Sequence, residues 1–154
     1  MLAKTQQKTL FQAHLTNNAL KLRPPLGFFR DFVVVEDGEH KDTLDLKHNG
    51  IIPIVDLARI YALSEGIEPV NTIERLRLAA GTPSLSKEAG ASLIDAFEFL
   101  SMLRIQHQAK QIKSNLPADN YLPPKEISKL ERAHLKSAFK VIQFLQNSLH
   151  SKFL

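Results

Sequence analysis

Four charged side chains stand inside an otherwise apolar segment near the middle of the chain: Asp45, Lys47, Asp56 and Arg59. Charges in such a setting are either paired with one another or held ready for a ligand, because an unpaired charge in apolar surroundings is costly. Asp56 and Arg59 are three residues apart on one expected helix, so a local ion pair is the simplest interpretation. Asp45 and Lys47 point to one face if this stretch is extended, where they either reach a ligand or anchor a hairpin.

A second group of polar side chains falls on helix faces that are otherwise apolar. Arg104 and His107 belong to the first of two long expected helices, and Glu131 and His134 belong to the second. If these helices pack antiparallel, the four side chains meet and should satisfy one another. The group is then either a buried polar cluster that fixes helix register, or a pocket at one end of the bundle for an anion or a nucleotide. A Glu-x-x-His metal site would need a second copy and more carboxylates, so we expect no metal.

The second long helix also carries a stripe of basic residues, namely Lys125, Lys129, Arg132, Lys136 and Lys140. A solvated helix face is the ordinary interpretation, and a track for phosphates or an acidic partner is the alternative. The interleaved aromatic residues of a single-strand binder are missing, so nucleic acid is not an expected partner. The formal net charge of +4 arises entirely within residues 81–154, and an excess of this size permits an anionic partner without requiring one.

The motifs of independent catalysis are missing from the sequence. The chain has no Gly-rich phosphate loop, no G-x-S-x-G elbow and no His-Glu-x-x-His motif. The Gly-Ser followed by Asp-x-Asp of a nucleotidyltransferase catalytic domain is absent as well, and so is a cluster of carboxylates that could hold magnesium. We therefore expect no catalytic residues in this chain by itself.

The elements that position these side chains are mainly helical. Helices are expected at residues 3–20, from Pro53 to about Glu65, from residue 72 to the turn at Gly81, at 86–113 and at 124–150. The buried face of the last helix is expected to contain Ile127, Leu130, His134, Ala138, Val141, Leu145 and Leu149. A short hairpin between Phe28–Glu36 and Thr43–Leu46 is expected around the Asp37-Gly38 turn. The prediction is an all-α, up-and-down helical bundle with a small β-hairpin or irregular insertion near residues 28–50.

Length and composition limit the broader assignment. A chain of 154 residues suits one domain spanning residues 1–154. The sequence contains no apolar run of the roughly 20 residues that cross a bilayer, so we expect no membrane partner. The absence of Cys excludes disulfides and thiolate chemistry, and the cytoplasm is the simplest location.

Several blocks of sequence together resemble one family. They include Arg23-Pro-Pro-Leu-Gly-Phe-Phe-Arg-Asp31, Asp37-Gly-Glu-His-Lys-Asp-Thr-Leu-Asp-Leu-Lys47, Pro53-Ile-Val-Asp-Leu-Ala-Arg59, Asn71-Thr-Ile-Glu-Arg-Leu76 and Ala96-Phe-Glu-Phe-Leu100. These blocks resemble the nucleotidyltransferase substrate-binding domain. That domain is usually the C-terminal part of bacterial signalling proteins with cyclic-nucleotide-binding, CBS and nucleotidyltransferase modules, which are similar to protein-PII uridylyltransferases.

The resemblance implies a helical bundle that assists a catalytic domain, in cis or in trans, in nucleotidyl transfer to a protein or a small acceptor. No cofactor is then expected on this chain alone, whereas Mg and a nucleoside triphosphate are implied for the catalytic partner. The candidate substrate-binding residues are Asp45, Lys47, Asp56, Arg59 and Arg75, facing the partner site, and Arg104, His107, Glu131 and His134, forming or bracing a polar pocket. The alternative is a dimerisation or docking module without a small-molecule ligand, for which Phe139, Phe144 and Phe153 would supply an exposed apolar patch and a homodimer is one option.

Overall fold

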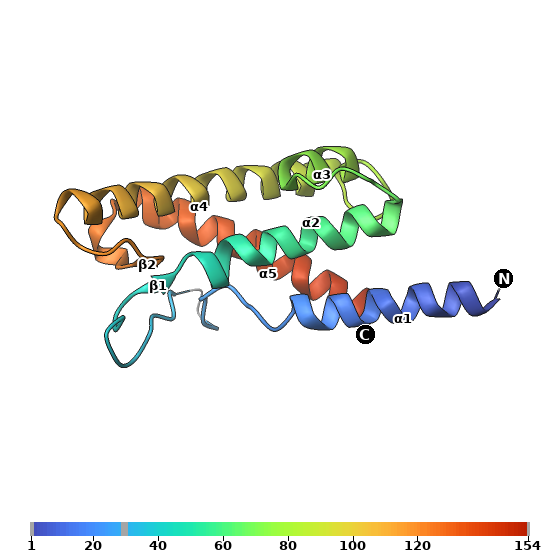
Figure 1. The fold of residues 1–154 in the computed structure, drawn as a ribbon, viewed down its shortest axis with the longest axis horizontal. Coiled ribbons are helices and arrows are strands. Elements are labelled where there is room, and N and C mark those ends of the chain that lie inside the picture. Colours follow the sequence, from blue (N-terminus) through green and yellow to red (C-terminus); the bar gives the residue numbers. More distant parts are fainter. Residues whose placement is uncertain (1, 29–30, 154) are drawn as a thin grey trace.

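The computed structural model describes residues 2–28 and 31–153, and its described part contains five α-helices and one two-stranded sheet (Figure 1). The helices are α1 (Leu2–Ala19), α2 (Ile52–Glu65), α3 (Thr72–Ala79), α4 (Lys87–Lys113) and α5 (Lys129–Phe153). The strands are β1 (Leu44–Asp45) and β2 (Tyr121–Leu122), and a π-helical turn at Lys47–Ile51 and a 3₁₀ turn at Pro124–Glu126 precede α2 and α5. The predicted all-α bundle with a small insertion is confirmed.

The bundle is built around the two long helices α4 and α5, with α2 packed beside them (Figure 1). Helix α3 joins α2 to the start of α4, and α1 packs against α2 and α5. The core between them contains Leu57 of α2, Leu93 and Leu100 of α4, and Phe139 and Ile142 of α5, each almost fully buried. Burial of apolar side chains from three helices in one cluster accounts for most of the stability of such a fold.

Local signals set the ends of the helices, as the sequence predicted. Pro53 lies in the first turn of α2, and Gly66 ends that helix with a left-handed φ of 69°. Asn71 caps α3, because its side chain accepts a hydrogen bond from the Glu74 amide at 3.1 Å. Ser86 caps α4 in the same way through the Ala89 amide. These short-range contacts fix where α2 ends and where α3 and α4 begin.

The strand partner expected for Thr43–Leu46 was wrong. Strand β1 pairs antiparallel with β2, with Leu44 opposite Leu122 and Asp45 opposite Tyr121. Residues 31–36 form no strand of the sheet, although Val35 exchanges two backbone hydrogen bonds with Thr43 and Asp42; residues 29–30 of the expected strand lie outside the described residues. Leu44 and Leu122 are both buried. Pairing of β1 with the distant β2 therefore places both leucines in the core, whereas a local hairpin would not bring them together.

The buried face of α5 also differs from the prediction. Leu130 is 84% exposed and His134 is exposed, whereas Phe139 is fully buried. The sequence predicted an exposed apolar patch that includes Phe139 and Phe144. The prediction is wrong for Phe139, which is buried, whereas Phe144 is 69% exposed. Ala138, Leu145 and Leu149 are buried as expected, so the face turned inward is rotated around the helix toward the bulky Phe139.

We found no membrane-spanning candidate among the helices of the described residues, since none is both long enough and apolar enough.

Candidate functional site

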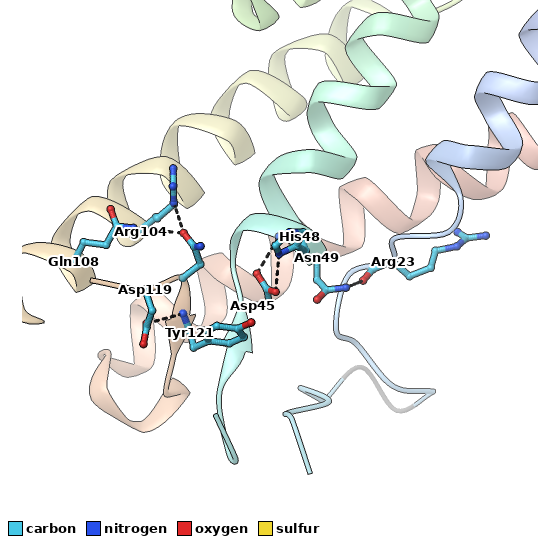
Figure 2. A network of polar contacts seen from close by, with 9 residues as sticks. Arg23, Asp45, His48, Asn49, Arg104, Gln108, Asp119 and Tyr121 are labelled. Carbon is cyan, nitrogen blue, oxygen red and sulfur yellow. Dashed lines mark hydrogen bonds and ion pairs between the residues drawn. The ribbon is translucent and has the colours of Figure 1, made fainter. Parts of the chain in front are cut away.

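The most organised polar contacts lie at the end of the bundle where the C-terminal half of α4 meets β1 and β2 (Figure 2). His107 of α4 is 7% exposed, and its Nε2 lies 2.9 Å from Oδ1 of Asp119 in the loop before β2. The same carboxylate oxygen accepts a hydrogen bond from the Tyr121 amide at 3.0 Å. The Asp119 amide donates to the side-chain oxygen of Gln111 at 2.9 Å. Asp119 therefore joins α4, its own loop and the start of β2.

The charge state of Asp119 follows from these contacts. Burial is the largest single influence and acts to raise its pKa, but the hydrogen bond from the Tyr121 amide, contacts with His107 and Gln111, and the attraction of His107 together outweigh it. The net pKa of Asp119 lies below its usual value of 3.8, so the carboxylate is ionised near neutral pH. An ionised carboxylate can only accept, so Nε2 of His107 donates, and in the neutral ring Nδ1 carries the free lone pair.

Arg104 holds the neighbouring residue of the same loop. Its Nε donates to Oδ1 of Asn120 at 2.5 Å, and Gln108 donates to the same oxygen at 3.4 Å (Figure 2). The carbonyl of Asn120 in turn accepts from the amide of Leu46 at 2.9 Å. Arg104 therefore positions the loop that carries β2 and, through it, the end of β1.

Asp45 has a local structural partner. One carboxylate oxygen accepts from the amide of His48 at 3.0 Å, and the other lies 2.9 Å from Nδ1 of the same residue. These contacts close the π-helical turn in which the half-buried Lys47 lies. Of the two earlier interpretations, anchoring of local structure describes Asp45. Figure 2 shows Asp45 at the same end of the molecule as Arg104 and Tyr121, and Asp45 pairs with Tyr121 in the sheet.

A hollow of about 310 Å³ opens at this end, and we call it the terminal hollow. It is lined from three sides: the segment before β1, the C-terminal half of α4, and the loop and strand β2. Its polar lining consists of Glu39, His40, Thr43, His107, Lys110, Gln111, Ser114, Asp119, Tyr121 and Glu126. A smaller hollow of about 110 Å³ adjoins it and shares His107, Lys110 and Glu126 with it.

One wall of the terminal hollow is formed by two stacked rings. The rings of His40 and Tyr121 are nearly parallel, at 6°, and their centroids lie 3.6 Å apart. Thr43, in the same segment as His40, donates its hydroxyl proton to the His40 carbonyl at 2.5 Å. A flat wall of this kind offers a face to an apolar or planar part of a ligand.

The predicted network of four side chains was wrong. Glu131 forms a reciprocal cap with Ser128 at the start of α5, at 3.1 Å in each direction. Nε2 of His134 lies 3.1 Å from Asp95, and its ring stacks on Phe99 at 3.7 Å. Short side chains in the loop before β2 satisfy Arg104 and His107 instead. Glu131 does line the smaller hollow together with His107, so these two of the four share a surface.

The remaining predicted residues, Asp56, Arg59 and Arg75, line neither hollow. Asp56 and Arg59 form the expected local ion pair at 3.2 Å, and burial raises the pKa of Asp56 while the Arg59 charge opposes the shift. Arg75 donates to the Pro69 carbonyl at 2.8 Å, so it braces the connection between α2 and α3 and is not paired with an acid. Figure 1 shows α3 at the opposite end of the bundle from β1 and β2.

The basic stripe of α5 is partly engaged within the chain. Lys136 pairs with Asp31 at 3.2 Å and lies over the Phe32 ring, and Arg132 donates to backbone carbonyls at the start of the helix. Lys125, Lys129 and Lys140 remain exposed. Along the described part of the chain, no group of three or more His, Asp or Glu side chains is placed to hold a metal ion.

Sequence reasoning missed Asp119, Asn120, His40, Lys110 and Tyr121. The one available signal was the pair of short polar residues Asp119 and Asn120. They follow a helix whose apolar face contains an arginine and a histidine. Such loop residues can accept hydrogen bonds from these side chains as effectively as a facing helix can.

Residues 9–153 match the model of a protein family described as "Putative nucleotidyltransferase substrate binding domain". The chain belongs to this family, and the resemblance noted in its sequence is confirmed. Membership supports an accessory binding role and implies a nucleotidyltransferase catalytic domain as the partner. Searches of curated proteins and of solved structures gave no match.

Proposed function

We propose that the chain is a non-catalytic domain that holds the acceptor for a nucleotidyltransferase catalytic domain in bacterial signal transduction. The transferred group goes to a small acceptor seated in the terminal hollow, and the catalytic domain, in cis or in trans, holds Mg and the nucleoside triphosphate. A nucleoside triphosphate donor places this reaction in the cytoplasm. The observation that carries the proposal is the hollow itself, with the buried His107 and its partly exposed partner Asp119 on one side and a stacked ring wall on the other.

The chemistry of the lining supports a binding role. His107 is oriented by Asp119, and Gln111 and the Tyr121 amide hold that carboxylate in turn, so the polar atoms are fixed before a ligand arrives. Preorganisation of this kind lowers the entropic cost of binding. The described residues do not gather the carboxylates that magnesium would require, which is why we assign the metal and the nucleotide to the catalytic domain.

The test is nucleotidyl transfer with a nucleotidyltransferase catalytic domain of the same organism, supplied in cis or in trans. Labelled ATP, UTP, CTP and GTP are supplied separately with Mg, and a low-molecular-weight metabolite fraction serves as the acceptor source. We expect label transfer and pyrophosphate release to require both domains. Ser114→Trp should reduce transfer at least tenfold, because Ser114 is exposed and lines the hollow, which the indole would fill.

Lys113→Trp is the matched control. Lys113 is the neighbouring exposed residue and does not line the hollow, so the same bulky side chain should change transfer less than twofold. Transfer that proceeds equally well without this chain, or equally well with Ser114→Trp, would contradict the proposal.

A docking or dimerisation module is the second candidate, and one surface favours it. Met102, Ile105 and Ile112 lie along the outer side of α4, and Leu116 follows them; all four are exposed. If the chain is a dimer by sedimentation, Ile105→Glu makes it a monomer, and Ser114→Trp leaves transfer unchanged, this second function replaces the first.

A further inference from the structure

The terminal hollow has a charge opposite to that of the whole chain. The chain carries a formal net charge of +4, yet Glu39, Asp119 and Glu126 line the hollow against a single lysine, Lys110. Asp119 is committed to His107 and the Tyr121 amide. Glu39 and Glu126 are exposed and form no ion pair with any described residue. Two uncommitted carboxylates therefore outweigh one ammonium at the opening, which attracts a cation and repels an anion.

The buried part of the hollow offers an acceptor of hydrogen bonds. The proton of His107 lies on Nε2, toward Asp119, so the neutral ring presents the lone pair of Nδ1. Nδ1 makes no hydrogen bond to any residue in the described part of the chain, and the ring lines both hollows. A ligand that donates a proton from a hydroxyl or an amine can satisfy this nitrogen, whereas an ionised phosphate oxygen, which only accepts, cannot.

The stacked wall acts in the same direction as the carboxylates. The faces of aromatic rings carry negative charge density, so the face of Tyr121 that His40 does not cover attracts a cation placed over it. The wall also accepts the hydrocarbon part of a ligand. Three separate features of the hollow thus favour one kind of ligand. Its carboxylates and its ring wall favour a positive charge, and its free imidazole nitrogen favours a hydrogen-bond donor.

We propose that the acceptor held in the terminal hollow is a small organic amine, whose ammonium group is bound by Glu39 and Glu126 and whose second proton-donating group binds Nδ1 of His107. This inference rests on the proposed function, because it names the class of acceptor for that site. It replaces the phosphate-bearing or acidic acceptor that the basic residues of the sequence had suggested.

Three probes of matched size test the charge preference: tyramine, 2-(4-hydroxyphenyl)ethanol and 4-hydroxyphenylacetate. They share a ring and a phenolic donor and differ in charge, which is positive, neutral and negative at pH 7. The readout is the amide NMR spectrum of the ¹⁵N-labelled chain at low salt. We expect saturable shifts at residues 39–43, 107–111 and 119–121 with tyramine, at least tenfold weaker binding of the alcohol, and no saturation with the carboxylate.

Variants assign the preference to the named carboxylates. The double change Glu39→Gln and Glu126→Gln should remove the preference for tyramine over the alcohol, and both residues are exposed, so the fold is retained. Glu98→Gln, at an exposed position of α4 outside the hollow, is the control and should keep it. Equal binding of all three probes, tighter binding of the carboxylate, or no binding of any probe would overturn the amine assignment.

A second measurement addresses His107 directly. In ¹⁵N spectra of the histidine side chains, we expect the Nε2-protonated tautomer in the free chain and a change at Nδ1 when tyramine binds. An Nδ1-protonated ring would overturn the role assigned to this residue. The two proposals fail in different ways. If transfer requires this chain but no amine binds to it, only the amine assignment is rejected. Amine binding in the hollow without any transfer rejects the accessory function.

Discussion

At the scale of single residues, Asp119 connects α4, its own loop and the start of β2, although it was not among the nine residues singled out from the sequence. Its side chain holds His107 and the Tyr121 amide, and its backbone amide binds Gln111. The sequence placed Arg104 and His107 on a buried face, which is correct for His107 and partly correct for Arg104, since Arg104 is half-buried. It assigned them the wrong partners, because a facing helix was considered and a connecting loop was not. Periodicity identifies which face of a helix is buried, but it carries no information on which loop folds back over that face.

The pKa of Asp119 predicts a pH dependence of stability. The folded-state pKa lies below the usual value of 3.8, so the stabilisation from the ionised carboxylate is present above about 3.8 and is lost as the pH falls through the folded pKa. Asp119→Asn keeps the shape and removes the charge. We expect it to lower the free energy of unfolding by about 1 kcal/mol at pH 7, the scale of a hydrogen bond to a charged group at a partly exposed site. The difference from the unmodified chain should shrink as the pH falls below about 3.8 and approach zero below the folded-state pKa.

Urea unfolding followed by circular dichroism between pH 2.5 and 7 measures this difference. Asp37→Asn serves as the control, because Asp37 is exposed and its substitution should change the free energy of unfolding by less than about 0.5 kcal/mol at every pH. A difference for Asp119→Asn that is the same at pH 3 as at pH 7 would show that its charge does not stabilise the fold.

At the scale of secondary-structure elements, Gly90 of α4 packs directly against Ala80 at the end of α3. A Cβ atom placed there would lie 2.6 Å from the Cβ of Ala80 and 3.3 Å from its Cα, closer than such atoms come in folded proteins. Since Ala80 follows directly after α3 and has no flexible side chain, the helices themselves would have to move. Glycine at this position costs helix propensity, and it is retained here where close helix packing requires it.

Gly90→Ala should therefore destabilise the chain although alanine is the better helix former. We expect the free energy of unfolding to fall by about 1–3 kcal/mol, the usual cost of overpacking, after a gain in helix propensity of up to about 1 kcal/mol. Ala91→Gly at the neighbouring exposed position measures propensity alone and should cost about 0.5–1 kcal/mol. Thermal and urea unfolding of the three proteins make the comparison, and a Gly90→Ala chain more stable than the unmodified one would rule out the proposed clash.

Elements were predictable from the sequence where their determinants are local. Gly66, Asn71 and Ser86 mark helix ends through contacts within a few residues, and the predicted bounds of α2, α3 and α4 lie within about two residues of the observed ones. The partner of β1 was missed because it lies on the far side of three helices in the chain, and nothing near residue 44 indicates residue 122. The predicted inward face of α5 differs from the observed one for a similar reason. Apolar residues cover enough of the helix surface for either of two faces to turn inward, and packing against the surrounding helices decides between them.

At the scale of the whole molecule, the two ends of the chain are tied together through one buried glutamine of α5. Gln146 is 1% exposed; its amide nitrogen donates to the Leu22 carbonyl at 2.8 Å, and its oxygen accepts from Arg23 at 3.3 Å. Arg23 also donates to Asn147 at 3.1 Å. The segment after α1 is irregular, so these contacts, together with the packing of α1 on α2 and α5, hold the N-terminal helix on the bundle.

Gln146→Leu should therefore loosen α1 before it affects the rest of the bundle. Leucine fills a similar volume but leaves the Leu22 carbonyl without its donor, and an unsatisfied buried group of this kind costs about 1–3 kcal/mol. Hydrogen exchange of the intact chain should show faster exchange for amides of α1 than in the unmodified protein, with little change in α4. Ser148→Ala, two residues further along and exposed, should leave both helices unchanged. If exchange accelerates equally in α1 and α4, then the chain opens as one unit and Gln146 contributes to global stability without tying down the N-terminal helix in particular.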